Sequence, residues 1–161
     1  MFNPCRRDEH FMALALQEAE IAAKNEEVPV GVVFVSGDKV IARACNQCEM
    51  LKDPTAHAEL IGLTQACAKM GVQRLVDVEV FVTKEPCVMC AGALVHARIS
   101  RLVVGAPDSK AGACGSVLDI VHHPRLNHQI PTVFGILDAD CRALLQDFFR
   151  SRRHKGDDNS V

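Results

Sequence analysis

The stretch VEVFVTKEPCVMCAGALVHARISRLVVGA, residues 78–106, decides the fold because a strand, a helix and a second strand follow one another in it. Its two ends, residues 78–83 and 101–106, are short apolar runs rich in β-branched valine, which favours the extended conformation. Between them, small and apolar side chains recur along one side of a helix that begins near Cys87. Strands joined by a helix usually run in the same direction, so this unit predicts an α/β sheet.

Upstream of this unit, the sequence predicts a helix and a hairpin. Residues 28–35 and 39–45 are apolar strands joined by the turn sequence Ser-Gly-Asp-Lys. The helix ends before Pro29, and its apolar face has helical spacing. That face consists of Met12, Ala15, Leu16, Ala19, Ala22 and Ala23.

A second helix is expected within residues 53–71. Asp53 or Thr55 can cap its start, and Gly71 suits its end because glycine readily adopts the left-handed conformation that closes helices. Its buried face is expected to be Leu60, Leu63, Thr64 and Cys67.

Downstream, residues 132–137 suggest a fifth strand, and a last helix runs from Asp138 to about Arg153. A hairpin followed by alternating strands and helices predicts one α/β sandwich with a largely parallel sheet. We therefore expect a single domain over residues 1–154. Residues 155–161 are polar, which predicts a disordered tail.

Composition restricts the classes of function. The chain has 161 residues, of which 48% are hydrophobic, enough for one packed core. A net charge of −2 excludes a general nucleic-acid coat protein, because such a protein needs a strong positive field. An enzyme that holds one RNA loop through a local basic patch remains compatible with this charge.

Eight cysteines raise the question of disulfides. The first residues, MFNPCRRDEHFM, lack the apolar segment of a signal peptide, and no apolar run is long enough to span a membrane. We therefore expect a cytoplasmic protein that is not bound to a membrane. In a reducing compartment, paired cysteines bind metal or perform chemistry more often than they form disulfides.

Cys87 and Cys90 are three residues apart at a helix start, where the helix dipole favours thiolates and both sulfurs face one side. Zinc is the usual ion for such ligands. Cys45 and Cys48 would complete a closed structural site, whereas His57 would leave a fourth position open, as in catalytic zinc sites.

The open site is favoured over the closed one. Cys48 is farther from Cys87 than in zinc ribbons, and Cys45 closes a predicted strand, where a tight zinc knuckle is not expected. We interpret that second cysteine pair as small buried residues. Glu59 follows His57 by two residues and can reach a site beyond the end of their helix. A carboxylate that is not a ligand can move the proton of a metal-activated water.

His-x-Glu followed by Pro-Cys-x-x-Cys is the signature of zinc-dependent nucleobase deaminases. The amino-acid sequences of five longer segments are also specific to one family. These segments, NEEVPVGVV, DPTAHAEL, EPCVMCAGALVHARI, VVGAPDSKAGACGSVLDIVHHPRLNH and DFFRSRR, resemble the bacterial tRNA-specific adenosine deaminases over roughly residues 8–153. Guanine and cytosine deaminases, which act on free bases, share the metal core and are the alternative within this class. A non-enzymatic zinc-stabilised binding module is the alternative outside it.

The resemblance implies a three-layer α/β/α sandwich of the cytidine-deaminase type with a mixed five-stranded sheet. It implies hydrolysis of adenosine to inosine at the wobble position of a tRNA anticodon, chiefly that of an arginine tRNA, by a homodimer. Zinc would be bound by His57, Cys87 and Cys90, and Glu59 would shuttle protons. Contacts to the anticodon stem-loop are expected from Asn46, Ala58, Asp108, His123, Phe149, Arg150, Arg152 and Arg153.

Three positions depart from the pattern of the family. Lys84 replaces an apolar residue, Gln47 stands where arginine is frequent, and Cys45 replaces glycine or a bulkier side chain. None of these residues is an expected ligand, so the departures concern the rim of the pocket.

Overall fold

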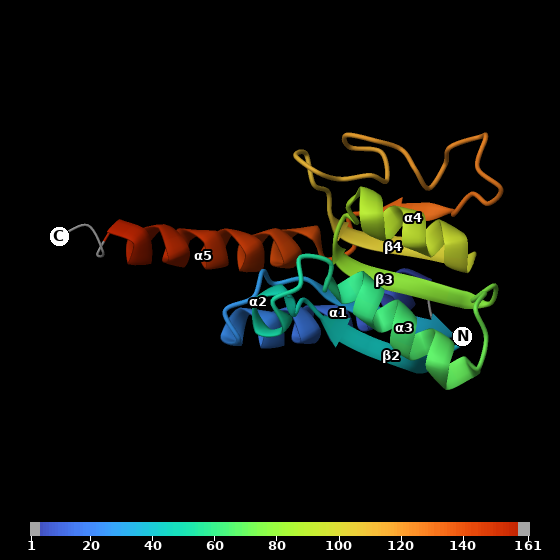
Figure 1. Ribbon diagram of the computed structural model, residues 1–161, viewed down its shortest axis with the longest axis horizontal. Coiled ribbons are helices and arrows are strands. Elements are labelled where there is room, and N and C mark those ends of the chain that lie inside the picture. Colours follow the sequence, from blue (N-terminus) through green and yellow to red (C-terminus); the bar gives the residue numbers. More distant parts are fainter. Residues whose placement is uncertain (1–3, 158–161) are drawn as a thin grey trace.

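The computed structural model describes residues 4–157, which form one sheet between two layers of helices (Figure 1). In this part of the chain, no helix is both long and apolar enough to cross a membrane. The elements are α1 (Pro4–Lys24), β1 (Gly31–Ser36), β2 (Lys39–Cys45), α2 (Cys48–Leu51), α3 (Ala58–Met70), β3 (Val78–Lys84), α4 (Val88–Ala97), β4 (Arg101–Ala106), β5 (Thr132–Phe134) and α5 (Asp138–Asp157).

The five strands have the order β2-β1-β3-β4-β5, and the sheet is mixed. β1 is antiparallel to β2 and to β3, whereas β3, β4 and β5 are parallel. Because β2 and β3 are both antiparallel to β1, they run in the same direction as β4 and β5. The expectation of a largely parallel sheet is therefore confirmed, with β1 as the one reversed strand among the described residues. The connection from β2 through α3 to β3 passes over one strand position in the sheet. β1 occupies this position and is antiparallel to both of its neighbours. The mixed five-stranded sheet implied by the resemblance is confirmed.

Both faces of the sheet are buried because side chains alternate along each strand. Val32 and Phe34 of β1 belong to the core beneath α3 and α4. Val33 and Val35 belong to the core beneath α1 and the start of α5, where Cys141 packs. The three-layer α/β/α sandwich is thus confirmed, and α5 continues well beyond the sheet (Figure 1).

Helix α3 presents small side chains to the sheet, and this brings its first turn close to the strand ends. The buried residues of α3 are Ala58, Glu59, Gly62 and Ala66. The predicted face is right only in part: Leu63 and Cys67 are half-buried and pack against the core, whereas Leu60 is half-buried without being part of it and Thr64 is exposed. A Cβ atom at position 62 would lie 2.6 Å from the ring of Phe34, so only glycine allows this approach.

Gly62→Val should lower the free energy of unfolding by about 1–3 kcal/mol, because the added carbons enter a packed core beside Phe34. Urea unfolding measures the change. Gln65→Val is the matched control, since it places the same side chain on an exposed position of α3. It should cost less than about 0.7 kcal/mol, the range of helix propensities. Equal losses for the two variants would contradict the close packing of α3.

Two helix boundaries differ from prediction. The carboxylate of Asp53 accepts hydrogen bonds from the backbone amide and hydroxyl of Thr55, 2.8 and 2.7 Å long, so it shapes a turn and α3 starts only at Ala58. Neither residue caps α3. Helix α5 extends to Asp157, into the expected disordered tail, since the chain from Asp138 to Lys155 contains no glycine or proline. Residues 158–161 of that predicted tail lie outside the described residues.

Candidate active site

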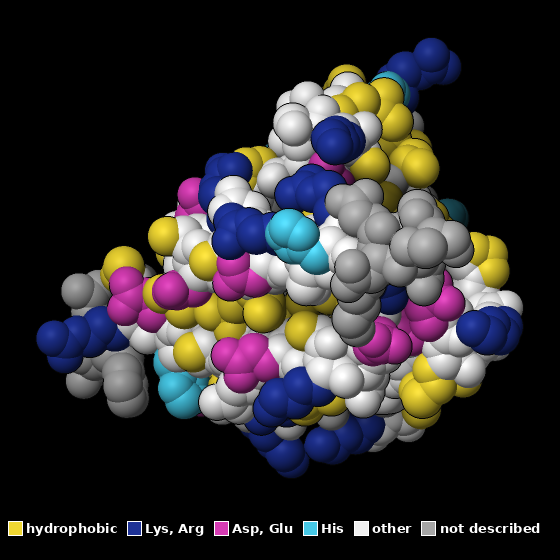
Figure 2. Space-filling model, turned by 90° about the vertical axis from the view of Figure 1, so that its left-hand side faces the viewer, with side chains coloured by type: hydrophobic (Ala, Val, Ile, Leu, Met, Phe, Trp, Pro, Cys, Tyr) yellow, Lys and Arg dark blue, Asp and Glu magenta, His cyan; other side chains and the backbone are white. Residues whose placement is uncertain are grey.

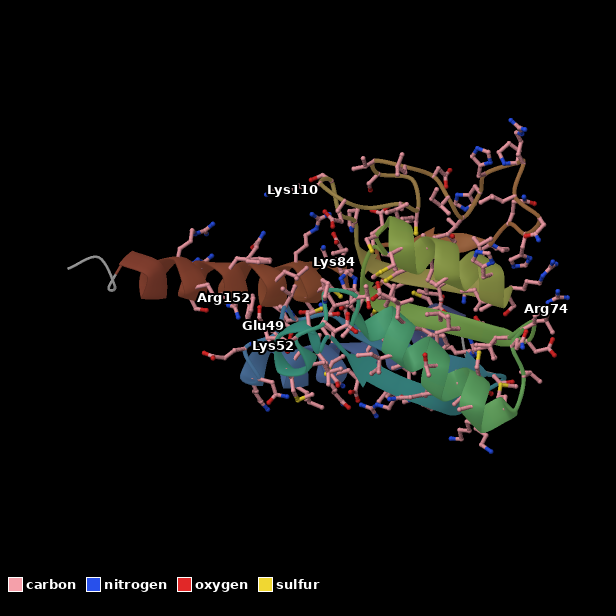
Figure 3. The ribbon with its side chains drawn as sticks, viewed as in Figure 1. Glu49, Lys52, Arg74, Lys84, Lys110 and Arg152 are labelled. Carbon is pink, nitrogen blue, oxygen red and sulfur yellow. The ribbon has the colours of Figure 1, made fainter. Side chains whose placement is uncertain are left out.

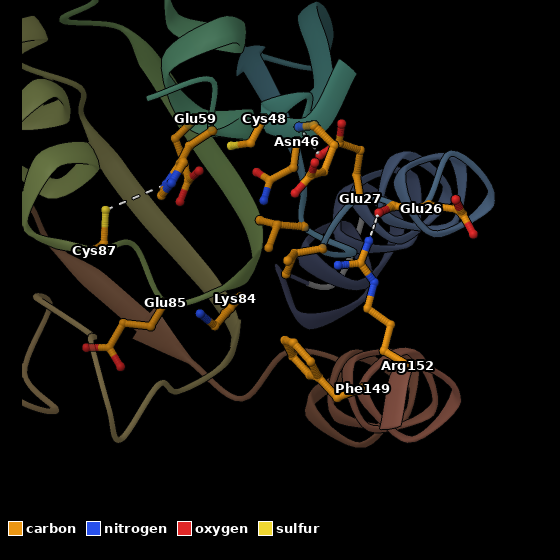
Figure 4. Close-up of a pocket in the computed structure, with 14 residues that line it drawn as sticks. Glu26, Glu27, Asn46, Cys48, Glu59, Lys84, Glu85, Cys87, Phe149 and Arg152 are labelled. Atoms are coloured by element: carbon orange, nitrogen blue, oxygen red, sulfur yellow. Dashed lines mark hydrogen bonds between the residues drawn. The ribbon is translucent and has the colours of Figure 1, made fainter. Parts of the chain in front are cut away.

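Three potential metal ligands meet where α3 and α4 begin. The Nδ1 atom of His57 lies 3.7 Å from Sγ of Cys87 and 3.5 Å from Sγ of Cys90, as the dashed line in Figure 4 indicates for Cys87. Within residues 4–157, only these three side chains form a group suited to a metal ion, with ligand atoms within 4.8 Å of one another. A tetrahedral zinc ion with bonds of about 2.0–2.3 Å separates its ligand atoms by roughly 3.5–3.8 Å, so the group fits zinc.

Local structure places these ligands. His57 is the N-cap residue of α3 and Cys87 is the N-cap residue of α4, and neither side chain caps its own helix. Both are therefore free to point across the gap between the helices. Because helix N-termini carry partial positive charge, the two converging helix starts favour thiolates.

The pKa values of the two thiols are shifted in opposite directions. A hydrogen bond from the Cys90 thiol lowers the pKa of Cys87 to about 3 against the opposing effect of burial, with a further contribution from His57. The same hydrogen bond and burial raise the pKa of Cys90. A bound cation would remove this conflict, since it stabilises both sulfurs as thiolates.

Glu59 lies in the first turn of α3 and is 4% exposed. Its Oε2 atom is buried and has no hydrogen-bond partner among the described residues. Burial raises the pKa of this carboxyl above its ordinary value of 4.5, against the attraction of His57. A buried carboxyl oxygen without a partner is costly, so its presence beside a potential metal group indicates a chemical role.

A cavity of about 280 Å³ opens onto this group. His57, Glu59 and Cys87 line its inner end, and Phe149 and Arg152 of α5 lie across its mouth (Figure 4). Its size suits a nucleoside, since small-molecule sites span about 300–1,000 Å³.

Asn46 lines the same cavity and is nearly buried. Its Oδ1 atom accepts a 2.8 Å hydrogen bond from the backbone amide of Ala58. Asn46 thereby fixes the start of α3, which carries Glu59. The two hydrogens of its amide nitrogen remain available to a ligand.

A larger groove of about 910 Å³ adjoins the cavity. It shares Lys84, Phe149 and Arg152 with the cavity. In Figure 3, Lys84 and Lys110 lie near the base of α5, and Arg152 lies farther out along this helix. Figure 2 shows the end of the molecule from which α5 projects, with Lys and Arg side chains beside hydrophobic ones. The other predicted contact residues in the groove are Asp108, Arg150 and Arg153.

Two predicted contact residues are not brought to the site. The side chain of Ala58 is fully buried, and its amide is taken by Asn46. His123 is exposed and lines neither the cavity nor the groove. Its Nδ1 atom accepts a 3.3 Å hydrogen bond from the backbone amide of Arg125 within its own loop. Contact between His123 and RNA stays a prediction.

Sequence reasoning missed two buried carboxylates that shape the site. Glu27 accepts hydrogen bonds from the backbone amides of Glu49 and Met50, 3.0 and 2.7 Å long, and so fixes α2 beside the cavity. Glu85 accepts hydrogen bonds from the loop after β4. The sequence signal for Glu85 was its place between a buried strand and Pro-Cys, where an acidic residue needs hydrogen-bond donors.

Glu85→Ala should disorder the loop after β4. The carboxylate accepts hydrogen bonds from the backbone amides of Asp108, Cys114 and Ser116 and from the Ser116 hydroxyl. Each buried donor left without a partner costs about 1–3 kcal/mol. Hydrogen exchange should show lost protection at the amides of Cys114 and Ser116. Unchanged protection there would contradict the anchoring role, and exposed Asp147→Asn provides the control.

Comparison with known proteins identifies the class first. The model of the MafB19-like deaminase family matches residues 6–153, so the chain is a deaminase by family. A guanine deaminase from Nitrosomonas europaea has a TM-score of 0.77 at 22% identity, covering 92% of this chain and 85% of that one, which shows a common fold alone.

Two further comparisons are more specific. The tRNA-specific adenosine deaminase of Bacillus subtilis (strain 168) is 41% identical over 149 residues, which are 92% of each chain. A solved structure from studies of A-to-I editing by tRNA:A34 deaminases at the wobble position of transfer RNA has a TM-score of 0.82 at 42% identity. It covers 84% of this chain and 99% of that one. The chain therefore belongs to the tRNA-specific adenosine deaminase family, and the predicted membership is confirmed.

Proposed function

We propose that this protein hydrolyses adenosine to inosine at the wobble position of a tRNA anticodon, with an arginine tRNA as its main substrate. The relatives' names support this reaction. The observation that carries it is the unpaired Oε2 atom of Glu59, buried beside a histidine and two cysteines in a cavity of nucleoside size.

In this proposal, His57, Cys87 and Cys90 hold zinc, which when bound supplies a water of lowered pKa as the nucleophile. Glu59 takes a proton from that water at its free oxygen and delivers it to N1 of adenine as C6 is attacked. Glu59 then moves the second proton to the departing amine, which leaves as ammonia. Its raised pKa suits this role, because a shuttle must both accept and release a proton near neutral pH.

The remaining site residues position the nucleotide. The target adenosine flips out of the loop into the cavity, at an unstacking cost of a few kcal/mol. Asn46 donates its free amide hydrogens to the nucleoside, and Phe149, which is 46% exposed, stacks on an unpaired base. Arg150, Arg152 and Arg153 contact phosphates along the groove.

The proposal includes a cytoplasmic homodimer, which the resemblance to the tRNA-specific adenosine deaminases implies. Three exposed apolar side chains support a protein interface near the start of α4. Val88 is 54% exposed, and Val117 and Leu118, in the loop bonded to Pro86, are 53% and 50% exposed. Sedimentation of wild type and Val88→Glu tests this part, with a dimer expected only for wild type.

A substrate comparison tests the reaction. The zinc-loaded protein is incubated separately with tRNA, guanine and cytosine, and released ammonia is measured. We expect ammonia from tRNA and none above background from the free bases. Release from guanine or cytosine alone would assign the chain to the free-base deaminases. A cobalt-substituted protein with four protein ligands and no exchangeable water would favour a structural zinc module.

A further inference from the structure

Lys84 joins the active-site cavity to the arginine-lined groove. It is the last residue of β3 and lines both hollows. In Figure 4 it lies between Glu59 and Cys87 on one side and Phe149 on the other. We propose that Lys84 binds a phosphodiester next to the flipped adenosine, an inference that rests on the proposed function.

The ammonium group of Lys84 is held in place by Asp108. Its Nζ atom lies 2.6 Å from Oδ2 of Asp108. The other carboxylate oxygen accepts hydrogen bonds from the backbone amides of Lys110 and Ala111, 3.0 and 3.2 Å long. Asp108 is in turn fixed through its own amide, which donates to Glu85. The carboxylate is therefore a rigid support, and the position of the lysine charge is defined before RNA binds.

This ion pair has capacity for a second anion on the lysine side. A lysine ammonium has three N–H donors, and Asp108 occupies one of them. The Lys84 side chain is 31% exposed, whereas that of Asp108 is 10% exposed. The lysine is the accessible member of the pair, so an incoming phosphate meets its positive charge first.

The neighbouring groups explain why that anion is a phosphodiester. When a base enters the cavity toward Glu59, the ribose and its phosphates remain at the mouth, where Lys84 lies. The groove beyond carries Arg150 and Arg153, which would bind the next phosphates of the same strand. Arg152 at the mouth already donates to the backbone carbonyl of Glu26. Lys84 is thus the cation best placed at the boundary between nucleoside and backbone.

The test is a double-mutant cycle that combines a substitution in the protein with a chemical change in the RNA backbone. Binding is measured by anisotropy on an anticodon stem-loop with purine ribonucleoside at the target position, which has no amino group to lose. The phosphodiesters on its two sides are replaced one at a time by uncharged methylphosphonates. Wild type should lose affinity about tenfold with one replacement, in keeping with a charged hydrogen bond. Lys84→Met should bind the natural RNA about as weakly as wild type binds that methylphosphonate RNA. The same methylphosphonate should not weaken the binding of Lys84→Met any further.

Salt dependence and a control variant complete the design. Lys84→Met should reduce the slope of log affinity against log salt by about 0.7, the value for one phosphate of a single strand. Arg74→Met, an exposed arginine at the opposite end of the molecule in Figure 3, should leave both readouts unchanged.

The outcomes separate the inference from the function on which it rests. If Lys84→Met retains the sensitivity of wild type, Lys84 is not the phosphate ligand. Circular dichroism checks that Lys84→Met is folded. Inosine formation by wild type on the adenosine-containing stem-loop is measured in parallel. Its absence contradicts the proposed function, whereas its presence with an insensitive Lys84 contradicts the inference alone.

Discussion

Glu59→Ala should keep the fold and the metal and lose roughly 10²- to 10⁴-fold in the rate of deamination, the usual contribution of a general acid–base group. The side chain is not one of the three clustered ligands, and its buried oxygen has no partner whose loss would disturb the core. Single-turnover inosine formation measures the rate, and metal analysis checks the zinc content. A variant that deaminates at nearly the wild-type rate would show that Glu59 moves no proton.

The same variant should change how the stability of the metal-free protein depends on pH. Burial raises the pKa of Glu59 above 4.5, so above this pH the unfolded chain releases a proton that the folded protein retains. The contribution of Glu59 to the free energy of unfolding should therefore fall with rising pH until the buried group itself ionises, so the stability of wild type should fall relative to that of Glu59→Ala. Urea unfolding from about pH 4 to 8, with metal removed by a chelator, compares wild type with Glu59→Ala. Parallel curves would contradict the raised pKa.

Cys87→Ser should lose both metal and activity. Changes to residues that merely orient a metal ligand lower affinity about 10- to 100-fold, so loss of a ligand should exceed about 100-fold. Competition with a chromophoric chelator measures the affinity, and inosine formation measures the activity.

Cys45→Ser is the matched control for this prediction. Cys45 is also a buried cysteine, yet it lies outside the group formed by His57, Cys87 and Cys90. It should keep its zinc with at most a loss of stability. Unaltered zinc affinity in Cys87→Ser, or loss of zinc in Cys45→Ser, would overturn the ligand assignment.

The strands were predictable because strand formation depends on the residue types within each short segment. Residues 39–45 and 101–106 match β2 and β4 at both ends, since apolar, β-branched runs bounded by turn residues leave few alternatives. The order of the strands depends on how many strand positions each crossover connection passes over. The hydrophobic pattern of the sequence carries no information on this. The fully buried part of the α3 face was missed because Gly62 and Ala66 face the sheet, and hydrophobic spacing is recognised mainly from larger side chains.

The metal group was predictable from residue types and spacing, because few other chemistries need His-x-Glu and Pro-Cys-x-x-Cys together. The roles of Glu27 and Glu85 were not, since their donors are backbone amides of distant loops. Lys84 was noted as a departure from the family pattern. Its partner Asp108 is 24 residues away in the sequence, and only the fold brings the two charges to 2.6 Å.

One measurement tests the central claim most directly. A tRNA with adenosine at the first anticodon position is incubated with zinc-loaded protein and sequenced by reverse transcription, which reads inosine as guanosine. We predict conversion at that position alone, with the chelated wild type and zinc-loaded Glu59→Ala as inactive controls. Absence of conversion by zinc-loaded wild type, or equal conversion by the chelated protein, would contradict a zinc-dependent tRNA adenosine deaminase.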